Sequence, residues 1–178
     1  MAQRTYQTEG VVLKTKEIGE ADRLVTIFTR RLGKLTAIAK GVRRINSRRS
    51  GSLEPATQAI FFFSRGHTWD ILTQVQLINS FPATRHNLSR ITQTYQILEI
   101  IYLLTPEHQE HQDIYELLVD TLTCLSQPGR KRELLVNHIR HLVTLLGFGT
   151  PPDPSEAALK AHIESIIDRS LRTKPILG

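Results

Sequence analysis

The chain has 178 residues, 40% of them hydrophobic, and a formal net charge of +6. This length supports one good core or two small ones, and the composition is typical of a globular chain. No apolar run approaches the roughly 18 residues of a membrane span, and Met1–Gln7 has no apolar signal core. The single cysteine, Cys124, excludes an internal disulfide and a cysteine-rich zinc site. We therefore expect a cytoplasmic protein without a cofactor.

The positive charge is concentrated in the first third of the chain. Residues 1–50 contain twelve Lys and Arg against four Asp and Glu, whereas residues 91–178 contain eight against eleven. This asymmetry indicates two units, with the contact to a polyanion on the first. A solvated basic surface without a partner is the simpler alternative.

Residues 1–80 have the pattern of β structure. Short runs rich in β-branched and aromatic residues alternate with turns that contain glycine. The expected strands are Thr5–Lys14, Arg23–Thr29, Lys34–Lys40, Thr57–Phe63 and Thr68–Leu77. Five short strands in this length predict an OB-type barrel, although the pattern alone also fits an SH3-like barrel.

Three glycine-containing or polar features should shape this barrel. Gly10, inside the first strand, predicts a bulge or sharp bend. Lys16–Asp22 is expected to be a polar loop, and Gly33 should take a positive φ in the next turn.

From about Asn87 the apolar period changes to that of helices. Apolar positions recur at helical spacing in four segments: Leu88–Tyr102, Ile114–Leu125, Leu134–Leu146 and Ala157–Leu171. Gly147 should lie just past the end of the third helix. Asp153–Glu156 should form a capping box, with Pro154 at the first helical position. The predicted fold class is therefore α+β: a five-stranded OB-fold barrel over residues 1–80, followed by a small helical domain of about four helices over residues 81–178.

A basic loop between Gly41 and Gly51, which we call the arginine loop, is the strongest functional feature of the sequence. It contains four arginines and no acidic residue, so it must be solvated or lie against an anionic partner. OB barrels bind single strands through a basic groove and through aromatic faces on which bases stack. The basic candidates for nucleic-acid contact are Lys14, Lys16, Arg23, Lys34, Lys40, Arg43, Arg44, Arg48 and Arg49.

Aromatic candidates for base stacking are Phe28, Phe61, Phe62, Phe63 and Trp69. Strand alternation should send Phe61 and Phe63 to one face and Phe62 to the other. Since one of these faces is core, at least one of the three should serve packing alone.

The residues offer little support for catalysis. The chain lacks a phosphate-binding loop and a Gly-x-Ser-x-Gly elbow. Cys124 lies in an apolar helical pattern, where a buried and inert thiol is expected. Two histidine pairs, His108 with His111 and His138 with His141, have helical spacing, and His162 could add a third metal ligand. No further ligand completes either set at a recognisable spacing, so we expect a binding protein rather than an enzyme.

Four segments of the first half of the chain form a recognisable series: Glu9–Leu13, Ile18–Thr29, Gly33–Lys34 and Ala39–Arg43. In this order they resemble the N-terminal domain of the RecO family of bacterial recombination mediators. Ser47 with the arginines after it, Leu53–Pro55, Leu72–Gln74 and Leu145–Phe148 extend the resemblance into the helical region.

The resemblance implies an OB fold followed by a helical domain, and it implies a function in DNA repair and recombination. It implies binding of single- and double-stranded DNA and annealing of complementary strands without ATP. It also implies partnership with RecR and with single-stranded-DNA-binding protein in loading RecA.

The sequence departs from the family at one place. Many RecO proteins carry a four-cysteine zinc module after the Leu-Gly-Phe element, whereas here Gly147–Asp153 leads directly into the last helix. A partner surface built on that module is therefore in doubt. Basic residues beside Leu134 and Leu135 could instead receive the acidic tail of single-stranded-DNA-binding protein; they are Arg130, Lys131, Arg132 and Arg140. A solvated helix start is the simpler interpretation of that cluster.

Two other functions fit the same residues. An OB-fold RNA-binding or ribosome-associated factor would share the basic loop and the aromatics. A protein-interaction adaptor would use the loop to contact an acidic partner. Preference for RNA over DNA would indicate the former, and a stable protein complex without nucleic-acid binding would indicate the latter.

Overall fold

The structure is a computed structural model that describes residues 4–42, 50–86, 88–129, 132–168 and 171–172. The chain divides into two compact units. The first consists of residues 1–80 together with residues 106–115, and the second consists of residues 81–105 and 116–178. We refer to them as the barrel unit and the helical unit.

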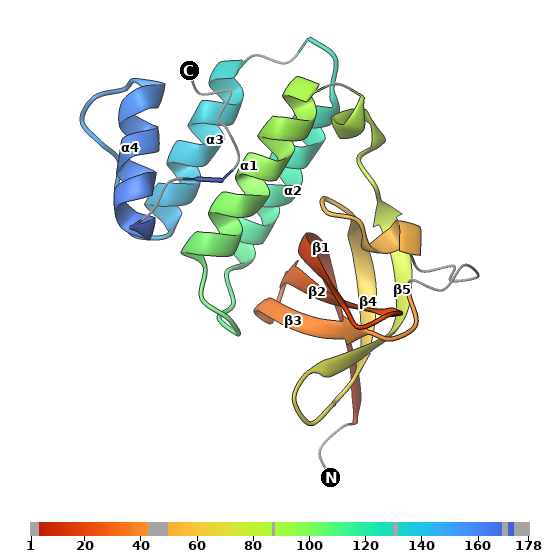
Figure 1. The fold of residues 1–178 in the computed structure, drawn as a ribbon. Helices are drawn as coiled ribbons and strands as arrows, with labels where there is room; N and C mark the ends of the chain where they lie inside the picture. The colour runs from red at the N-terminus through yellow and green to blue at the C-terminus, as the bar shows by residue number, and fades with distance from the viewer. Residues whose placement is uncertain (1–3, 43–49, 87, 130–131, 169–170, 173–178) are drawn as a thin grey trace. The chain divides into compact units, whose positions relative to one another are not determined.

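The barrel unit is a closed five-stranded barrel with strand order β1-β2-β3-β5-β4 (Figure 1). Its strands are β1 (Thr5–Ile18), β2 (Asp22–Thr29), β3 (Gly33–Ala39), β4 (Gln58–Ser64) and β5 (Asp70–Asn79). Antiparallel pairing of β1 with β4 closes the barrel, and a short parallel pairing joins β3 to β5. With the helices that follow, this architecture confirms the predicted α+β class and the OB-type barrel.

The barrel core is formed by the inward-facing residues of all five strands. Phe61 and Phe63 are 0% and 1% exposed, whereas Phe62 between them is half-buried, as strand alternation predicts. Tyr6 packs against this core and stacks on Phe63, with their ring centroids 4.9 Å apart. Val42 and Leu53, on either side of the arginine loop, are both fully buried in the same core.

Gly10 and Leu13 have different functions in β1. Gly10 pairs with both neighbouring strands, and a Cβ atom there would lie 2.6 Å from Ile27 Cγ2. The glycine therefore permits close approach of the strands. The bulge that we predicted at Gly10 lies instead between Val12 and Lys14, so that Leu13 is the extra residue.

The predicted loop at Lys16–Asp22 is shorter than expected. β1 continues to Ile18 and β2 begins at Asp22, because their backbones pair up to Ile18 opposite Asp22. Gly19, with φ +56°, lies in the turn between them. Gly33 has φ +68°, which confirms the conformation predicted for it.

Residues 106–115, which we call the linking segment, pack on the barrel. His108 N donates to Lys34 O at 2.9 Å, and Lys34 also forms a parallel bridge with Glu107. At its other end Tyr115 OH donates to Glu9 Oε1 at 3.0 Å. Gln58 Nε2 donates to the same carboxylate oxygen at 2.8 Å. The strands β1 and β4 and the linking segment therefore meet at Glu9.

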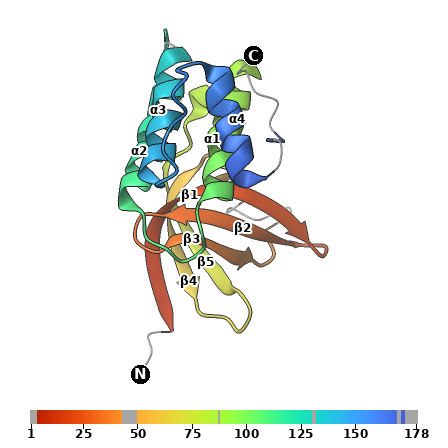
Figure 2. The ribbon, with the colours of Figure 1, turned by 90° about the vertical axis from the view of Figure 1, so that its left-hand side faces the viewer.

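The helical unit contains α1 (Leu88–Leu104), most of α2 (Gln112–Ser126), α3 (Arg132–Leu145) and α4 (Glu156–Ile167). The helices lie along one another in both ribbon views (Figures 1 and 2). Gly147 lies past the end of α3 with φ +83°, as predicted. The expectation for α4 was wrong by two residues: its N-cap is Ser155, whose Oγ accepts from Ala158 N at 3.1 Å, and Pro154 precedes the cap.

Candidate nucleic-acid interface

The bulge at Leu13 sets which way the second half of β1 faces. Before the bulge, Val12 pairs with Ile27, and both belong to the barrel core. After it, Lys14 pairs with Thr26 rather than with the inward-facing Val25. Since directly paired residues share a face of the sheet, the extra residue places Lys14, and Lys16 two positions on, on the outside of the barrel.

The rows of paired residues continue across β2 and β3. Lys14, Thr26 and Thr36 form one row, and Lys16, Leu24 and Ile38 form the next. Thr26 Oγ1 and Thr36 Oγ1 share a hydrogen bond of 3.1 Å, which fixes the centre of this surface. We call these six residues the lysine face. In OB folds the surface of strands 2 and 3 is the usual site of oligonucleotide binding.

The arginine loop begins just after β3, one of the strands of the lysine face. Ile38 leads through Ala39 to the exposed Lys40, and Gly41 N donates to Asp22 Oδ1 at 2.8 Å. Gly41 has φ +66°, a conformation that suits a glycine at this turn. The loop re-enters the barrel at the short 3₁₀-helix η1 (Ser50–Leu53). The four loop arginines in the prediction, Arg43, Arg44, Arg48 and Arg49, lie outside the described residues.

Arg23 is on β2 but not on the lysine face. It pairs with Ala39, an inward-facing core residue. Its guanidinium lies 3.2 Å from Glu54 Oε1, and its side chain is only 17% exposed. Arg23, which we predicted to contact DNA, is therefore engaged in an ion pair with Glu54.

Lys34 is on the same outer face of β3 as Thr36 and Ile38, but the linking segment covers it. It is 7% exposed, and burial lowers the pKa of its ammonium group, while Glu107 acts in the opposite direction. Of the predicted basic residues that the structure describes, Lys14, Lys16 and Lys40 are exposed together, whereas Arg23 and Lys34 are engaged elsewhere.

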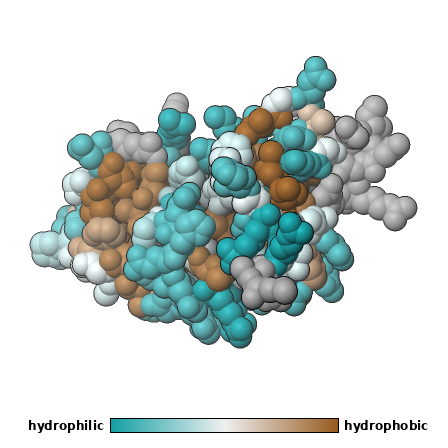
Figure 3. Space-filling model, turned by 90° about the horizontal axis from the view of Figure 1, so that it is seen from below, coloured by the Kyte–Doolittle hydropathy of each residue, from teal (hydrophilic) through white to brown (hydrophobic). Residues whose placement is uncertain are grey.

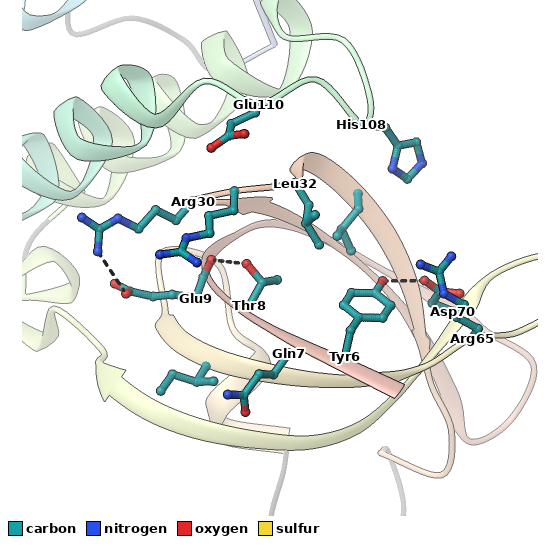
Figure 4. A pocket seen from close by; sticks show the side chains of 13 residues that line it. Tyr6, Gln7, Thr8, Glu9, Arg30, Leu32, Arg65, Asp70, His108 and Glu110 are labelled. Carbon is teal, nitrogen blue, oxygen red and sulfur yellow. Dashed lines mark hydrogen bonds and ion pairs between the residues drawn. The ribbon is translucent and has the colours of Figure 1, made fainter. Parts of the chain in front are cut away.

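The aromatic candidates are mostly core residues. Phe28, Phe61 and Phe63 are at most 1% exposed, so none of them can stack on a base without unfolding. Trp69 is 42% exposed in the turn before β5, and Phe62 is half-buried. Sequence reasoning missed Tyr6, which lines a pocket of about 730 Å³ with residues from three other parts of the barrel unit (Figure 4). No sequence pattern links those positions.

The predicted partner-tail cluster is only partly described. Arg130 and Lys131 lie outside the described residues, and Arg132 is described only as the first residue of α3. Arg140 donates hydrogen bonds to the carbonyl oxygens of Pro154 and Ser155, just before α4. On the face shown in Figure 3, hydrophobic side chains gather in several areas among hydrophilic ones.

Only one of the two histidine pairs lies on a helix: His138 and His141 are both in α3. His108 and His111 precede α2, which begins at Gln112, and His108 has φ +59°. His138 shares a hydrogen bond of 2.9 Å with Thr121, and burial lowers its imidazole pKa. Within the described ranges no three His, Cys, Asp or Glu side chains are grouped to hold a metal ion. Cys124 is half-buried.

Among the described helices α1 is the longest, with 17 residues. Within the part of the chain that the structure describes, none is both long enough and apolar enough to cross a bilayer.

The fold and this surface define an OB-barrel protein with a cationic outer face. Comparison with known proteins makes the assignment specific. Residues 1–81 match the family model described as "Recombination protein O N terminal". Proteins named "DNA repair protein RecO" are similar over most of the chain. Over most of its length the chain is thus similar to members of the RecO family.

Three of these relatives illustrate the extent of the similarity. The protein of Pelotomaculum thermopropionicum is 31% identical over 146 residues, covering 82% of this chain and 56% of the relative. That of Roseiflexus is 32% identical over 148 residues, with 83% and 52% covered. That of Symbiobacterium thermophilum is 29% identical over 176 residues, with 97% and 68% covered. The chain thus spans little more than half the length of the first two relatives.

Proposed function

We propose that this protein acts in DNA repair and recombination as a mediator that binds DNA and anneals complementary strands without ATP. The observation that carries the proposal is the lysine face, where Lys14 and Lys16 project from the strand surface that OB folds use for oligonucleotides. Lys40 extends this surface to the root of the arginine loop. The names of the relatives, "DNA repair protein RecO", support the same function.

The mechanism is electrostatic. Two complementary strands repel each other through their phosphates, and a lysine or arginine that neutralises a phosphate releases a condensed counterion. The lysine face and the arginine loop hold each strand while the other approaches, and base pairing supplies the free energy of annealing. No side chain in this scheme forms or breaks a covalent bond, so the protein works as a binding surface rather than as an enzyme.

Partners follow from the family. We propose that the protein acts in the cytoplasm with RecR and with single-stranded-DNA-binding protein, and that it helps to load RecA on covered single strands. Arg140 and the basic residues before it remain our candidates for the acidic tail of single-stranded-DNA-binding protein. Because Arg140 already donates to two backbone carbonyls, binding there would have to exchange these hydrogen bonds for a carboxylate.

Annealing of two labelled complementary oligonucleotides, without ATP and at low and physiological salt, tests the proposal. The double variant Lys14→Ala/Lys16→Ala should slow annealing and flatten the salt dependence of single-strand affinity, with a slope smaller by about 1.4 if each lysine neutralises one phosphate. A second variant, with alanine at Arg43, Arg44, Arg48 and Arg49, tests the arginine loop separately.

The matched control is Lys160→Ala/Arg172→Ala, which removes the same charge from the helical unit. It should retain wild-type annealing. Equal losses in the control and in Lys14→Ala/Lys16→Ala would show that net charge alone matters, and would contradict a specific site on the barrel. Annealing of RNA strands in preference to DNA would contradict the assignment to DNA.

A further inference from the structure

The pocket around Tyr6 lies on the barrel unit but away from the lysine face. It is lined by the first half of β1, by the turn between β2 and β3, by the residues on either side of the turn into β5, and by the linking segment (Figure 4). Tyr6 and Lys14 are eight residues apart on one strand, which is roughly 26 Å of extended chain. The pocket is therefore a separate site, and the lysine face does not use it.

Three acidic residues line the pocket, Glu9, Asp70 and Glu110, and the first two are engaged by the protein itself. Asp70 accepts a hydrogen bond from Tyr6 OH through one oxygen and from Gly66 N, at 3.1 Å, through the other. Glu9 accepts from Gln58 and Tyr115, and its second oxygen lies 3.8 Å from Arg30. The carboxylates of Asp70 and Glu9 are thus turned toward donors of the protein itself, whereas Glu110 is exposed.

Two arginines of the pocket, Arg31 and Arg65, have side chains that are not engaged in this way. Among the described residues, the side chains of Arg31 and Arg65 form no hydrogen bond and no ion pair, and both residues are exposed. The Arg65 guanidinium lies 5.6 Å from the centre of the Tyr6 ring. Two guanidinium groups at the mouth of a pocket are suited to bind phosphate groups, for which their planar donor arrangement is well matched.

Tyr6 offers an aromatic surface that the barrel holds in place. One face of its ring packs on Phe63 in the core, and its hydroxyl is fixed by Asp70. Burial and Asp70 raise the pKa of this hydroxyl, so it stays protonated and keeps donating to the carboxylate. A fixed ring with an arginine guanidinium over it combines the aromatic surface and the cation that single-stranded nucleic acids use for stacking.

We infer that this pocket binds one unpaired nucleotide of single-stranded DNA, with its base taking the place of the Arg65 guanidinium over the Tyr6 ring and its flanking phosphates on Arg31 and Arg65. The volume of about 730 Å³ lies within the range of small-ligand sites. The inference rests on the proposed function, and it adds a second contact to the barrel. A protein with two separate contacts can hold two strands, or two parts of one strand, at the same time.

Photochemical cross-linking tests the inference on the whole protein. The probe is a thymidine oligonucleotide of about eight nucleotides, within the ~4–16 that one OB barrel covers, with 5-iodo-2′-deoxyuridine in its centre. Irradiation joins iodouracil to an aromatic side chain on which it stacks, and mass spectrometry of the peptides locates the bond. We expect a cross-link at Tyr6.

Variants distinguish the pocket from the lysine face. Arg31→Ala/Arg65→Ala should lower the cross-link yield at Tyr6 by about tenfold, and both side chains are exposed, so the fold should be retained. Lys14→Ala/Lys16→Ala, measured at saturating oligonucleotide, should leave the share of cross-links at Tyr6 unchanged. Lys160→Ala/Arg172→Ala again controls for net charge.

The outcomes separate this inference from the proposed function. If the protein binds the oligonucleotide and anneals strands but cross-links only outside the pocket, the inference is overturned and the proposed function stands. A wild-type yield at Tyr6 in Arg31→Ala/Arg65→Ala would overturn the assigned phosphate contacts. If the folded protein binds no DNA at low salt, both the proposed function and the inference fail.

Discussion

The outer face of the barrel has two ends that the same three strands build in different ways. At one end Val11, Phe28 and Lys34 form a row across β1, β2 and β3, and all three are buried. At the other end the rows begin with the exposed Lys14 and Lys16. We call them the covered end and the open end.

The comparison shows that charge and strand position do not suffice to make a binding residue. Lys34 and Thr36 project from the same face of the same strand, two residues apart. At Lys34 the linking segment supplies backbone hydrogen bonds and removes the ammonium group from solvent. At the open end the bulge at Leu13 turns two lysines outward. What distinguishes the ends is a segment from elsewhere in the chain and one extra residue in β1.

The largest loss of stability should come from disrupting the packing of the linking segment on the barrel. Gly33 has φ +68°, and a Cβ atom there would overlap the backbone of Gln109 in the linking segment. Gly33→Val should therefore lower the free energy of unfolding by about 3 kcal/mol, through the strained backbone and the clash together. Urea denaturation measures this loss.

Gly19→Val is the matched control for that variant. Gly19 also has a positive φ, +56°, but no atom lies within 4 Å of its Cβ position. Its cost should be the backbone term alone, about 1 kcal/mol. Equal losses in the two variants would mean that the linking segment does not pack on Gly33 in solution.

A smaller loss of stability should follow from weakening the second contact of the linking segment with the barrel, at Tyr115. Tyr115 is 2% exposed and donates to Glu9, and Gln58 donates to Tyr115 OH at 3.3 Å. Tyr115→Phe should cost about 1 kcal/mol at neutral pH, since it removes these hydrogen bonds while keeping the ring.

The same residue should make stability depend on alkaline pH. Burial, first, and then Glu9 raise the pKa of the Tyr115 hydroxyl above the ordinary value of 10.0. Above pH 10 the unfolded chain loses this proton while the folded protein keeps it, so stability should fall by at most about 1.4 kcal/mol per pH unit. Below pH 10 this contribution should be constant. Urea titrations across this pH range should show a shallower decline in Tyr115→Phe, and an unchanged decline would contradict the assignment.

Much of the fold could be predicted from the sequence because local pattern determines it. Strand alternation placed Phe61 and Phe63 inside, and helical periodicity found all four helices. The end of β1 was predicted at Lys14 because Lys16 and Glu17 are polar and suggested a loop. In the structure these two residues pair with β2, and this pairing extends the strand to Ile18. The cap of α4 was misplaced because Asp153 and Ser155 are both good N-cap residues, and the sequence does not rank them.

The candidate site was harder to predict because it depends on contacts between distant residues. Basic composition identified Lys14, Lys16 and Lys40, but it also identified Lys34, which residues 107–109 cover. Arg23 was included because no local signal indicates its ion pair with Glu54, 31 residues away. Tyr6 was missed for the same reason: its partners Phe63, Arg65 and Asp70 are some 60 residues further along the chain.

The smallest expected effect gives the sharpest test of the comparison. Lys34→Met removes a positive charge from the barrel but keeps the length and the apolar contacts of a buried stem. Because the ammonium group is covered, this change should alter single-strand affinity by less than about twofold, whereas Lys14→Ala/Lys16→Ala should weaken it several-fold with a flatter salt dependence. Fluorescence anisotropy of a labelled oligonucleotide at two salt concentrations measures both. A loss in Lys34→Met as large as that per lysine at the open end would mean that the linking segment opens to admit DNA, and the covered end would then belong to the binding surface as well.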